Sequence, residues 1–191
     1  MVSTAVKIAR MMAYFWAEHK VINQFARGKI LDIGFTQRPN KLFRSEVVGL
    51  DLEIPRQKPE NYSRMVRGDA HRLTKYFRRN EFDTVAASNL IEHLENPTEF
   101  MRQCNKVLKK GGLLIISTDN PYRWQTLIGN VFFPKGMMSN DQHIIYVEPR
   151  NLNRMAFRQK FSLVDIKCGE GLSFPFLQEK LIYVYRKTGD I

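Results

Sequence analysis

Three acidic residues follow three successive apolar segments of this chain. Asp32 stands two residues before Gly34 in "KILDIG", Asp51 lies near the end of "EVVGLDLE", and Asp69 ends "RMVRGD". If the segments are parallel strands, their ends meet at one edge of a sheet. There, one carboxylate can accept two hydrogen bonds from ribose hydroxyls, another can accept from an adenine amino group, and a glycine allows close approach to the backbone. The order predicts a site for a nucleoside-bearing cofactor, although each acid alone is also an ordinary turn residue.

The segments that position these acids are expected to form a parallel sheet. Strands that alternate with helices favour an α/β domain with helices on both faces. The fourth segment is apolar almost throughout, as expected for a strand buried on both faces. The five predicted strands of this part are residues 29–34, 46–53, 64–69, 81–88 and 112–118.

The clearest predicted helix is "NPTEFMRQCNKVLKKGG", between the fourth and fifth strands. Asn96 can cap it, Pro97 suits the first helical position, and Glu99 completes a capping-box pattern. Basic residues and a glycine are expected to close the helix at its other end. The predicted apolar stripe and the closing residues are Phe100, Cys104, Val107, Leu108 and Lys109 to Gly111.

The two ends of the chain complete the expected domain. An amphipathic helix is predicted over about 4–26, and a helix near 149–160 follows an irregular excursion at 119–147. Long excursions in compact domains are often functional. The last two predicted strands, 161–168 and 180–187, are expected to pair as an antiparallel edge.

Composition limits the classes of protein and partner. With 191 residues and 43% hydrophobic residues, the chain has the size of one globular domain. Cys104 and Cys168 lie far apart, so we expect no disulfide framework and no metal site, and a cytoplasmic location fits. Charged residues interrupt every long apolar run, so no membrane span is expected, although residues 127–134 could touch a membrane surface. The net charge of +11 favours an anionic partner, but the basic residues are scattered rather than clustered.

One block of the sequence resembles a known family. The block "FDTVAASNLIEHLENPTEFMRQCNKVLKKGGLLIISTDNP", with "GLDLE" and "RGDAH" before it, is similar to the class I S-adenosylmethionine-dependent methyltransferases, especially the group that acts on small molecules. The resemblance covers about residues 28 to 168. It implies a Rossmann-like, seven-stranded, mostly parallel sheet, with S-adenosylmethionine as the cofactor. We expect one domain over 1–191, with 1–27 as an N-terminal helical cap and 119–147 as an insertion on the substrate side.

The resemblance also implies roles for individual residues. Asp51 would hold the ribose diol, Asp69 with Ala70 would read the adenine edge, and Leu52 would pack on adenine. The acid and glycine after the first strand would border the methionine moiety. The cofactor-binding residues that it implies are Asp32, Gly34, Phe35, Thr36, Asp51, Leu52, Asp69, Ala70, His71, Ser88, Asn89 and Leu90.

The loop after the first strand departs from the family pattern. The family has Asp-x-Gly-x-Gly-x-Gly, whereas Thr36 and Arg38 stand here at the second and third glycine positions. We expect Phe35 and Thr36 to stand further from the methionine tail, with Thr36 or Gln37 offering a side-chain hydrogen bond. The same change leaves open a non-catalytic module that kept the fold and lost the donor site.

Two histidines are candidates for acid–base chemistry. His93, in "IEHL", would lie near the transferred methyl group, and His143 lies where related enzymes place a histidine facing the substrate; a purely structural role remains the alternative for each. A base is needed only if the acceptor loses a proton, as a hydroxyl does. "DNPY" at 119–122 is similar to a motif of nucleic-acid methyltransferases, but it follows the fifth strand rather than the fourth.

The expected acceptor is a small molecule. By family analogy it is a hydroxyl of a sugar, a glycan precursor or a lipid-linked intermediate. The basic residues near the excursion would suit an anionic acceptor. An RNA or protein methyltransferase is the alternative that the positive net charge supports.

Overall fold

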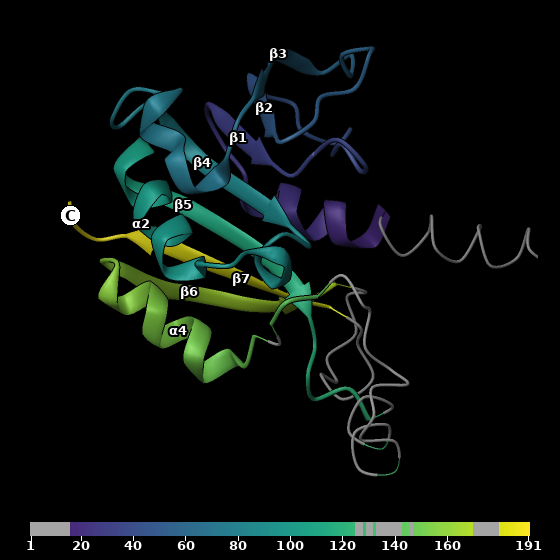
Figure 1. The fold of residues 1–191 in the computed structure, drawn as a ribbon, viewed down its shortest axis with the longest axis vertical. Coiled ribbons are helices and arrows are strands. Elements are labelled where there is room, and N and C mark those ends of the chain that lie inside the picture. The colour runs from purple at the N-terminus through teal and green to yellow at the C-terminus, as the bar shows by residue number, and fades with distance from the viewer. Residues whose placement is uncertain (1–15, 125–127, 129–131, 133–142, 146, 170–179) are drawn as a thin grey trace, which may run out of the picture.

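A seven-stranded sheet runs through the protein (Figure 1). The structure is a computed structural model that describes residues 16–124, 128, 132, 143–145, 147–169 and 180–191. The strand order is β3-β2-β1-β4-β5-β7-β6. In chain order the strands are β1 (Ile30–Ile33), β2 (Val47–Asp51), β3 (Tyr62–Arg67), β4 (Phe82–Ser88), β5 (Leu108–Asp119), β6 (Phe161–Cys168) and β7 (Lys180–Lys187).

The strand pairing confirms the predicted α/β class. Strands β1 to β5 pair in parallel, and β7 pairs antiparallel with both β5 and β6. The predicted antiparallel edge is therefore present, and β7 lies between the parallel part of the sheet and β6. Because β1 has β2 on one side and β4 on the other, the chain changes direction across the sheet at β1. In open α/β sheets, ligands bind at such a switch point, beyond the carboxyl ends of the strands.

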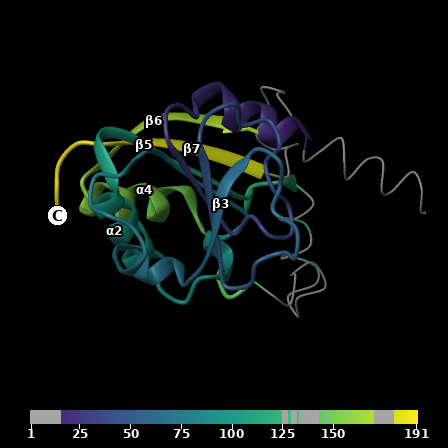
Figure 2. The same cartoon turned by 90° about the horizontal axis from the view of Figure 1, so that it is seen from above.

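Alternation along the strands produces two cores, one on each face of the sheet. Leu31 and Ile33 of β1 pack on one face with the 3₁₀ helix η1 (Ala70–Lys75), α2 (Pro97–Val107) and α4 (Pro149–Arg158). Ile30 packs on the other face with Val21 and Ile22 of the N-terminal helix, residues 16–25. Figure 2 shows the N-terminal helix on one side of the sheet and α2 and α4 on the other. Asp32 has the parity of Ile30, so it faces the N-terminal helix.

Helix α2 keeps the predicted cap but not the whole capping box. The Asn96 side chain accepts a hydrogen bond from Glu99 N at 2.9 Å. The Glu99 carboxylate does not complete the box; it accepts instead from Arg102 and Gln103 one turn further on. The predicted apolar stripe is buried, but the helix ends at Val107, earlier than expected. The following residues already belong to β5, with a register shift against β4 and Gly111 at a φ of 74°.

The described part of the N-terminal helix is packed against the sheet by its apolar side chains. None of the described helices is long and apolar enough to cross a membrane. The predicted helix residues before 16, most of the excursion at 119–147 and the glycine-rich segment after 169 lie outside the described residues.

Candidate active site

Four of the segments that carry predicted site residues meet at the carboxyl edge of the parallel strands. Asp51 ends β2 and pairs in register with Arg67 of β3, while Asp32 of β1 lies between Gly49 of β2 and Ala86 of β4. The segments after β3 and β4 therefore emerge at the same edge. The structure thus brings together residues that are far apart in the sequence, as the predicted cofactor site requires.

The loop after β1 is anchored by an aromatic side chain. Phe35 is buried and stacks on Tyr62, with ring centroids 5.0 Å apart. It fills the space above Gly49, where an added Cβ would lie 2.5 Å from the ring. Gly34 has a φ of 79° and lies against Leu90, which an added Cβ would approach to 3.3 Å. The Phe35 side chain is therefore part of the core, and only its backbone remains to face a ligand.

Asp51 holds this loop in place. Its Oδ2 accepts from Thr36 N at 2.9 Å and its Oδ1 accepts from Leu52 N at 2.8 Å. The Thr36 hydroxyl donates within the protein, to the carbonyl of Glu53. Each carboxylate oxygen can accept a second hydrogen bond, so Asp51 keeps the capacity to receive a ribose diol. Leu52 beside it is 66% exposed, as an apolar surface for a base would be.

The segment after β3 forms a second polar corner. Asp69 caps η1, because its Oδ1 accepts from His71 N at 2.8 Å and lies 2.9 Å from His71 Nδ1. Burial raises the pKa of Asp69, but the hydrogen bonds from His71 outweigh that effect and hold the pKa below its ordinary value. Ala70 is buried, and His71 Nε2 is buried without a hydrogen-bond partner. That nitrogen is placed to meet a ligand atom.

The turn after β4 joins the edge to the N-terminal helix. Asn89 has a φ of 51°, and its backbone N–H donates to Ser117 O on β5 at 3.0 Å. Its side-chain Nδ2 reaches Glu18 Oε1 at 3.3 Å, while its Oδ1 is buried without a partner. Ser88 and Leu90 flank it and are partly buried. The turn therefore exposes a mixed polar and apolar surface at the switch point.

A buried acid pair lies on the face that the N-terminal helix covers. Asp32 accepts a hydrogen bond from the Tyr62 hydroxyl, and Glu18 accepts one from the Ser117 hydroxyl. Both side chains are almost completely buried. Burial raises the pKa of Asp32 to about 7 against the opposing hydrogen bond from Tyr62, and the nearby Asp51 and Glu18 raise it further.

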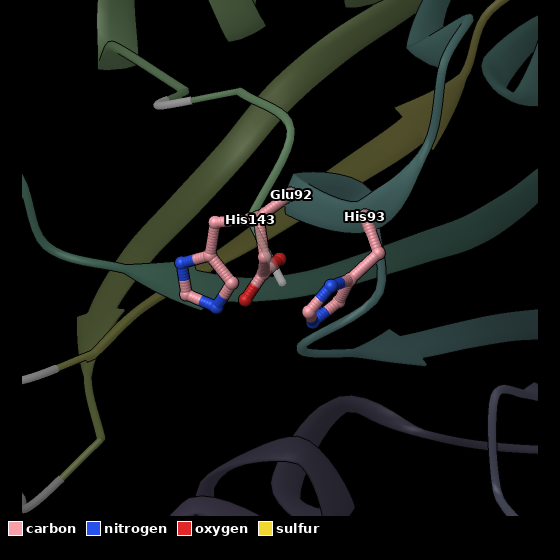
Figure 3. Close-up of side chains that lie close together, drawn as sticks. All are labelled: Glu92, His93 and His143. Carbon is pink, nitrogen blue, oxygen red and sulfur yellow. The ribbon is translucent and has the colours of Figure 1, made fainter. Parts of the chain in front are cut away.

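A second polar cluster lies at the same edge and contains both candidate histidines. Figure 3 shows the Glu92 carboxylate between the imidazoles of His93 and His143, whose ring centroids are 4.8 Å apart. Glu92 belongs to the 3₁₀ helix η2 (Ile91–His93) and is buried, with Oε2 3.2 Å from the Thr118 hydroxyl. Burial raises the pKa of Glu92 even though the Lys180 ammonium group opposes the shift.

The surroundings of His143 suit a proton acceptor. Its Nδ1 lies 3.3 Å from Asp119 Oδ2, and Lys180 pairs with the same carboxylate and lies 3.9 Å from Glu92 Oε1. Burial lowers the pKa of His143, although Asp119 opposes the shift, so the neutral imidazole dominates at neutral pH. An acid that contacts one ring nitrogen fixes the orientation of the imidazole, as a general base requires.

The same cluster also has the donor types of a metal site. One ligand atom each from Glu92, His93 and His143 lies within 4.8 Å of the others. Carboxylate and imidazole suit several divalent ions. The positive charge of Lys180 opposes a cation at this place.

A family model described as "Methyltransferase domain" matches residues 31–116. The S-adenosylmethionine-dependent methyltransferase of Archaeoglobus fulgidus has the same fold, with a TM-score of 0.66 at 18% identity over 93% of this chain and 94% of that one. The enzyme of the same description from Mesorhizobium loti gives 0.60 at 18% identity, over 91% and 97% of the two chains. Residues 31–116 thus match a methyltransferase domain, and the fold of the chain is that of class I S-adenosylmethionine-dependent methyltransferases.

Curated relatives match this methyltransferase over shorter segments. The ubiquinone biosynthesis O-methyltransferase of Idiomarina loihiensis is 33% identical over 81 residues, 39% of this chain and 32% of its own length. The mitochondrial enzyme of the same name from Rattus norvegicus is 43% identical over 51 residues, 27% of this chain and 15% of its own length. The matched part is thus about a third of these relatives' length or less.

The residues of the methyltransferase fit S-adenosylmethionine. Among the described residues, Asp32 and Glu18 form no ion pair with a basic group, which suits a cationic ligand. His71 Nε2 and Asn89 Oδ1 are buried polar atoms without hydrogen-bond partners. Gly34 is partly exposed at the switch point. These features are the kind that a charged nucleoside cofactor requires.

Sequence reasoning missed several residues of the site. Glu18 belongs to none of the sequence motifs of the site, yet it lies on one helical stripe with Val21, Ile22 and Phe25. An acid on an apolar stripe could have signalled a buried partner. The sequence around Lys180 does not indicate a site residue. Lys180 reaches Asp119 only because β7 pairs antiparallel with β5.

Proposed function

We propose that this methyltransferase transfers a methyl group from S-adenosylmethionine to a hydroxyl group of a small molecule. The observation that carries the proposal is the Asp119–His143 pair beside Glu92 and His93, at the edge where the predicted cofactor residues lie. A hydroxyl must lose its proton during the transfer, and a neutral imidazole that an aspartate orients can accept it. The names of the curated relatives, which are O-methyltransferases, point the same way.

The proposed reaction is a balanced displacement. The acceptor oxygen forms a bond to the methyl carbon, the carbon–sulfur bond breaks with its electron pair left on sulfur, and the hydroxyl proton passes to the base. The protein's share is to orient the acceptor, exclude water and hold that proton. His143 is our candidate for the base, with His93 second.

The chemical class of the acceptor hydroxyl is a separate proposal. A hydroxyl on a sugar, a glycan precursor or a lipid-linked intermediate is the expectation from family analogy. A phenolic hydroxyl is the second candidate, because the lowered pKa of His143 makes it a weak base and a phenol, with a pKa near 10, gives up its proton more readily than a sugar hydroxyl.

The test is methyl transfer from labelled S-adenosylmethionine to a panel of sugar, lipid-linked glycan and phenolic acceptors. We expect an O-methyl product, and turnover only on RNA or protein would contradict the proposal. His143→Gln is expected to lower kcat by about 10²–10⁴-fold while S-adenosylhomocysteine binding stays intact. A chelator should leave the rate unchanged if His143 acts as the base, whereas a loss restored by a divalent ion would assign the cluster to a metal.

The pH profile of the wild-type rate adds an independent check. Since burial lowers the pKa of His143, its base form persists below pH 6.5, and the rate should fall only at more acidic pH. A rate that falls already between pH 8 and 7 would rule out His143 as the base.

A non-catalytic module is the second candidate, and the loop after β1 favours it. Thr36 stands at the second glycine position of the family pattern, and its backbone N–H and its hydroxyl both bond within the protein. Thermal unfolding with S-adenosylhomocysteine separates the two. Ligand at 100 times its Kd stabilises a binding protein by about 2.7 kcal/mol, whereas no shift at millimolar ligand would support the module.

A further inference from the structure

Glu18 is a fully buried carboxylate for which the proposed reaction gives no role. It projects from the N-terminal helix toward β5, where the Ser117 hydroxyl donates to its Oε1. Asn89 Nδ2 donates to the same oxygen at 3.3 Å. Both donors are neutral, and together they hold the carboxylate at the switch point of the sheet.

Asp32 places a second carboxyl group near the first. It receives the Tyr62 hydroxyl, and the Tyr62 oxygen accepts in turn from Asn40 N at 3.1 Å. Among the described residues, no ion pair involves Glu18 or Asp32. Burying carboxylates without a cation is unfavourable, so the arrangement is incomplete without a positive group.

Buried polar atoms without hydrogen-bond partners, on Asn40 and Asn89, indicate where the positive group of a ligand would bind. Asn40 is 3% exposed, and its Nδ2 has no hydrogen-bond partner. Asn89 Oδ1, on the side chain that reaches Glu18, is also buried and unpartnered. Buried polar atoms normally find partners, so these two atoms point to a ligand with both donors and acceptors.

We propose that Glu18, together with Asp32, binds the α-ammonium group of the cofactor's methionine moiety, which makes the N-terminal helix part of the cofactor site. The inference rests on the proposed function, because it takes S-adenosylmethionine as the ligand. An ammonium group has three N–H donors, and each carboxylate keeps lone pairs beyond those already used. Glu18 comes from outside the segment that the family model matches.

The acid–base state of Asp32 supports this assignment. Burial, Asp51 on β2 and Glu18 on the helix raise its pKa to about 7, while Tyr62 on β3 and the backbone of Asn40 oppose the rise. At neutral pH Asp32 of the ligand-free protein therefore holds a proton for part of the time. An arriving ammonium group favours the ionised carboxyl, so binding releases that proton.

The test compares two ligands that differ only at the amino group. Calorimetric titration measures the affinity of the full chain for S-adenosylhomocysteine and for its analogue with hydrogen in place of the amino group. We expect the wild-type protein to prefer the amino compound, and Glu18→Gln to reduce that preference by about 10- to 100-fold. Glu60→Gln, which removes the same charge from an exposed position, should leave it unchanged.

The other possible results of these titrations separate failure of the inference from failure of the proposed function. An unchanged preference in Glu18→Gln, or an equal loss for both ligands, would overturn the inference while proposed methyl transfer stands. If wild-type protein binds neither ligand, the proposed function fails and the inference with it. If Glu18→Gln does not fold, the pH dependence of binding to the wild-type protein replaces the variant. An affinity that rises from pH 6 to 8 for the amino compound alone supports the inference. The same pH dependence for both ligands overturns it.

Discussion

Asp32 illustrates how one buried side chain can link folding, ligand binding and pH. Its pKa rises from 3.8 to about 7 in the folded protein, chiefly because burial disfavours the charged form. Between these two values the folded state binds more protons than the unfolded state. The contribution of Asp32 to stability is therefore lost as pH rises through this window. A group with this behaviour is unfavourable to the ligand-free fold and is understandable as part of a binding site.

Replacing this carboxyl group should make the effect measurable. Asp32→Asn keeps an acceptor for the Tyr62 hydroxyl but cannot ionise. We expect the variant to gain about 1–3 kcal/mol relative to wild type between pH 5 and pH 8, by urea unfolding of ligand-free protein. Its affinity for S-adenosylhomocysteine should fall. A stability difference that is the same at both pH values would contradict the assigned pKa.

Substitutions of Asp51 test the proposed contact with the ribose. Asp51→Ala should weaken cofactor binding by about 1–3 kcal/mol and leave the protein folded. The structure adds that the loop after β1 loses its bond from Thr36 N, so Asp51→Asn, which keeps one acceptor, should lose less. Titration with S-adenosylhomocysteine measures both. Unchanged affinity in Asp51→Ala would mean that the ribose lies elsewhere.

Among the elements, the loop after β1 carries the main departure from the family pattern. Phe35 lies where Gly49 leaves space for its ring, and the ring stacks on Tyr62. The loop is thus fixed by packing of a side chain against the sheet, rather than by a run of glycines. The conformation of the loop after β1 therefore depends on the absence of a side chain at Gly49 of β2.

A substitution at Gly49 should therefore disturb the loop. The new Cβ of Gly49→Ala would lie 2.5 Å from the Phe35 ring, and the overpacking should cost about 1–3 kcal/mol of stability and weaken cofactor binding. A smaller side chain at position 35 would make room for the new Cβ at position 49. Phe35→Leu combined with Gly49→Ala should recover part of the affinity that Gly49→Ala loses. Additive losses in the double variant would show that the two positions act independently.

The elements also show what the sequence could predict. The apolar strand segments, the Asn96 cap and the apolar stripe of α2 are local signals, and they predict the sheet and its main helix. β3 begins two residues earlier than expected, at Tyr62, because pairing with Val47 decides its start. The early start of β5 at Leu108 likewise depends on a register shift against β4. Pairing partners are not visible in a single strand's sequence.

At the scale of the whole molecule, the site combines residues from both faces of the sheet. Glu18 and Asp32 lie on the face of the N-terminal helix, while Glu92 lies with α2 and α4 on the other face. The motif residues could be predicted because each follows a strand. Glu18, Tyr62 and Lys180 could not, since only the folded sheet brings them to the edge.

We propose that the carboxyl edge of the parallel strands binds the cofactor across β1. A crystal structure of the protein with S-adenosylhomocysteine tests it most directly. We predict the ribose at Asp51, the adenine beside Leu52 and Asp69, and the methionine moiety between Asp32 and Glu18. A ligand bound at any other part of the sheet, or an empty edge at saturating ligand, would contradict the account.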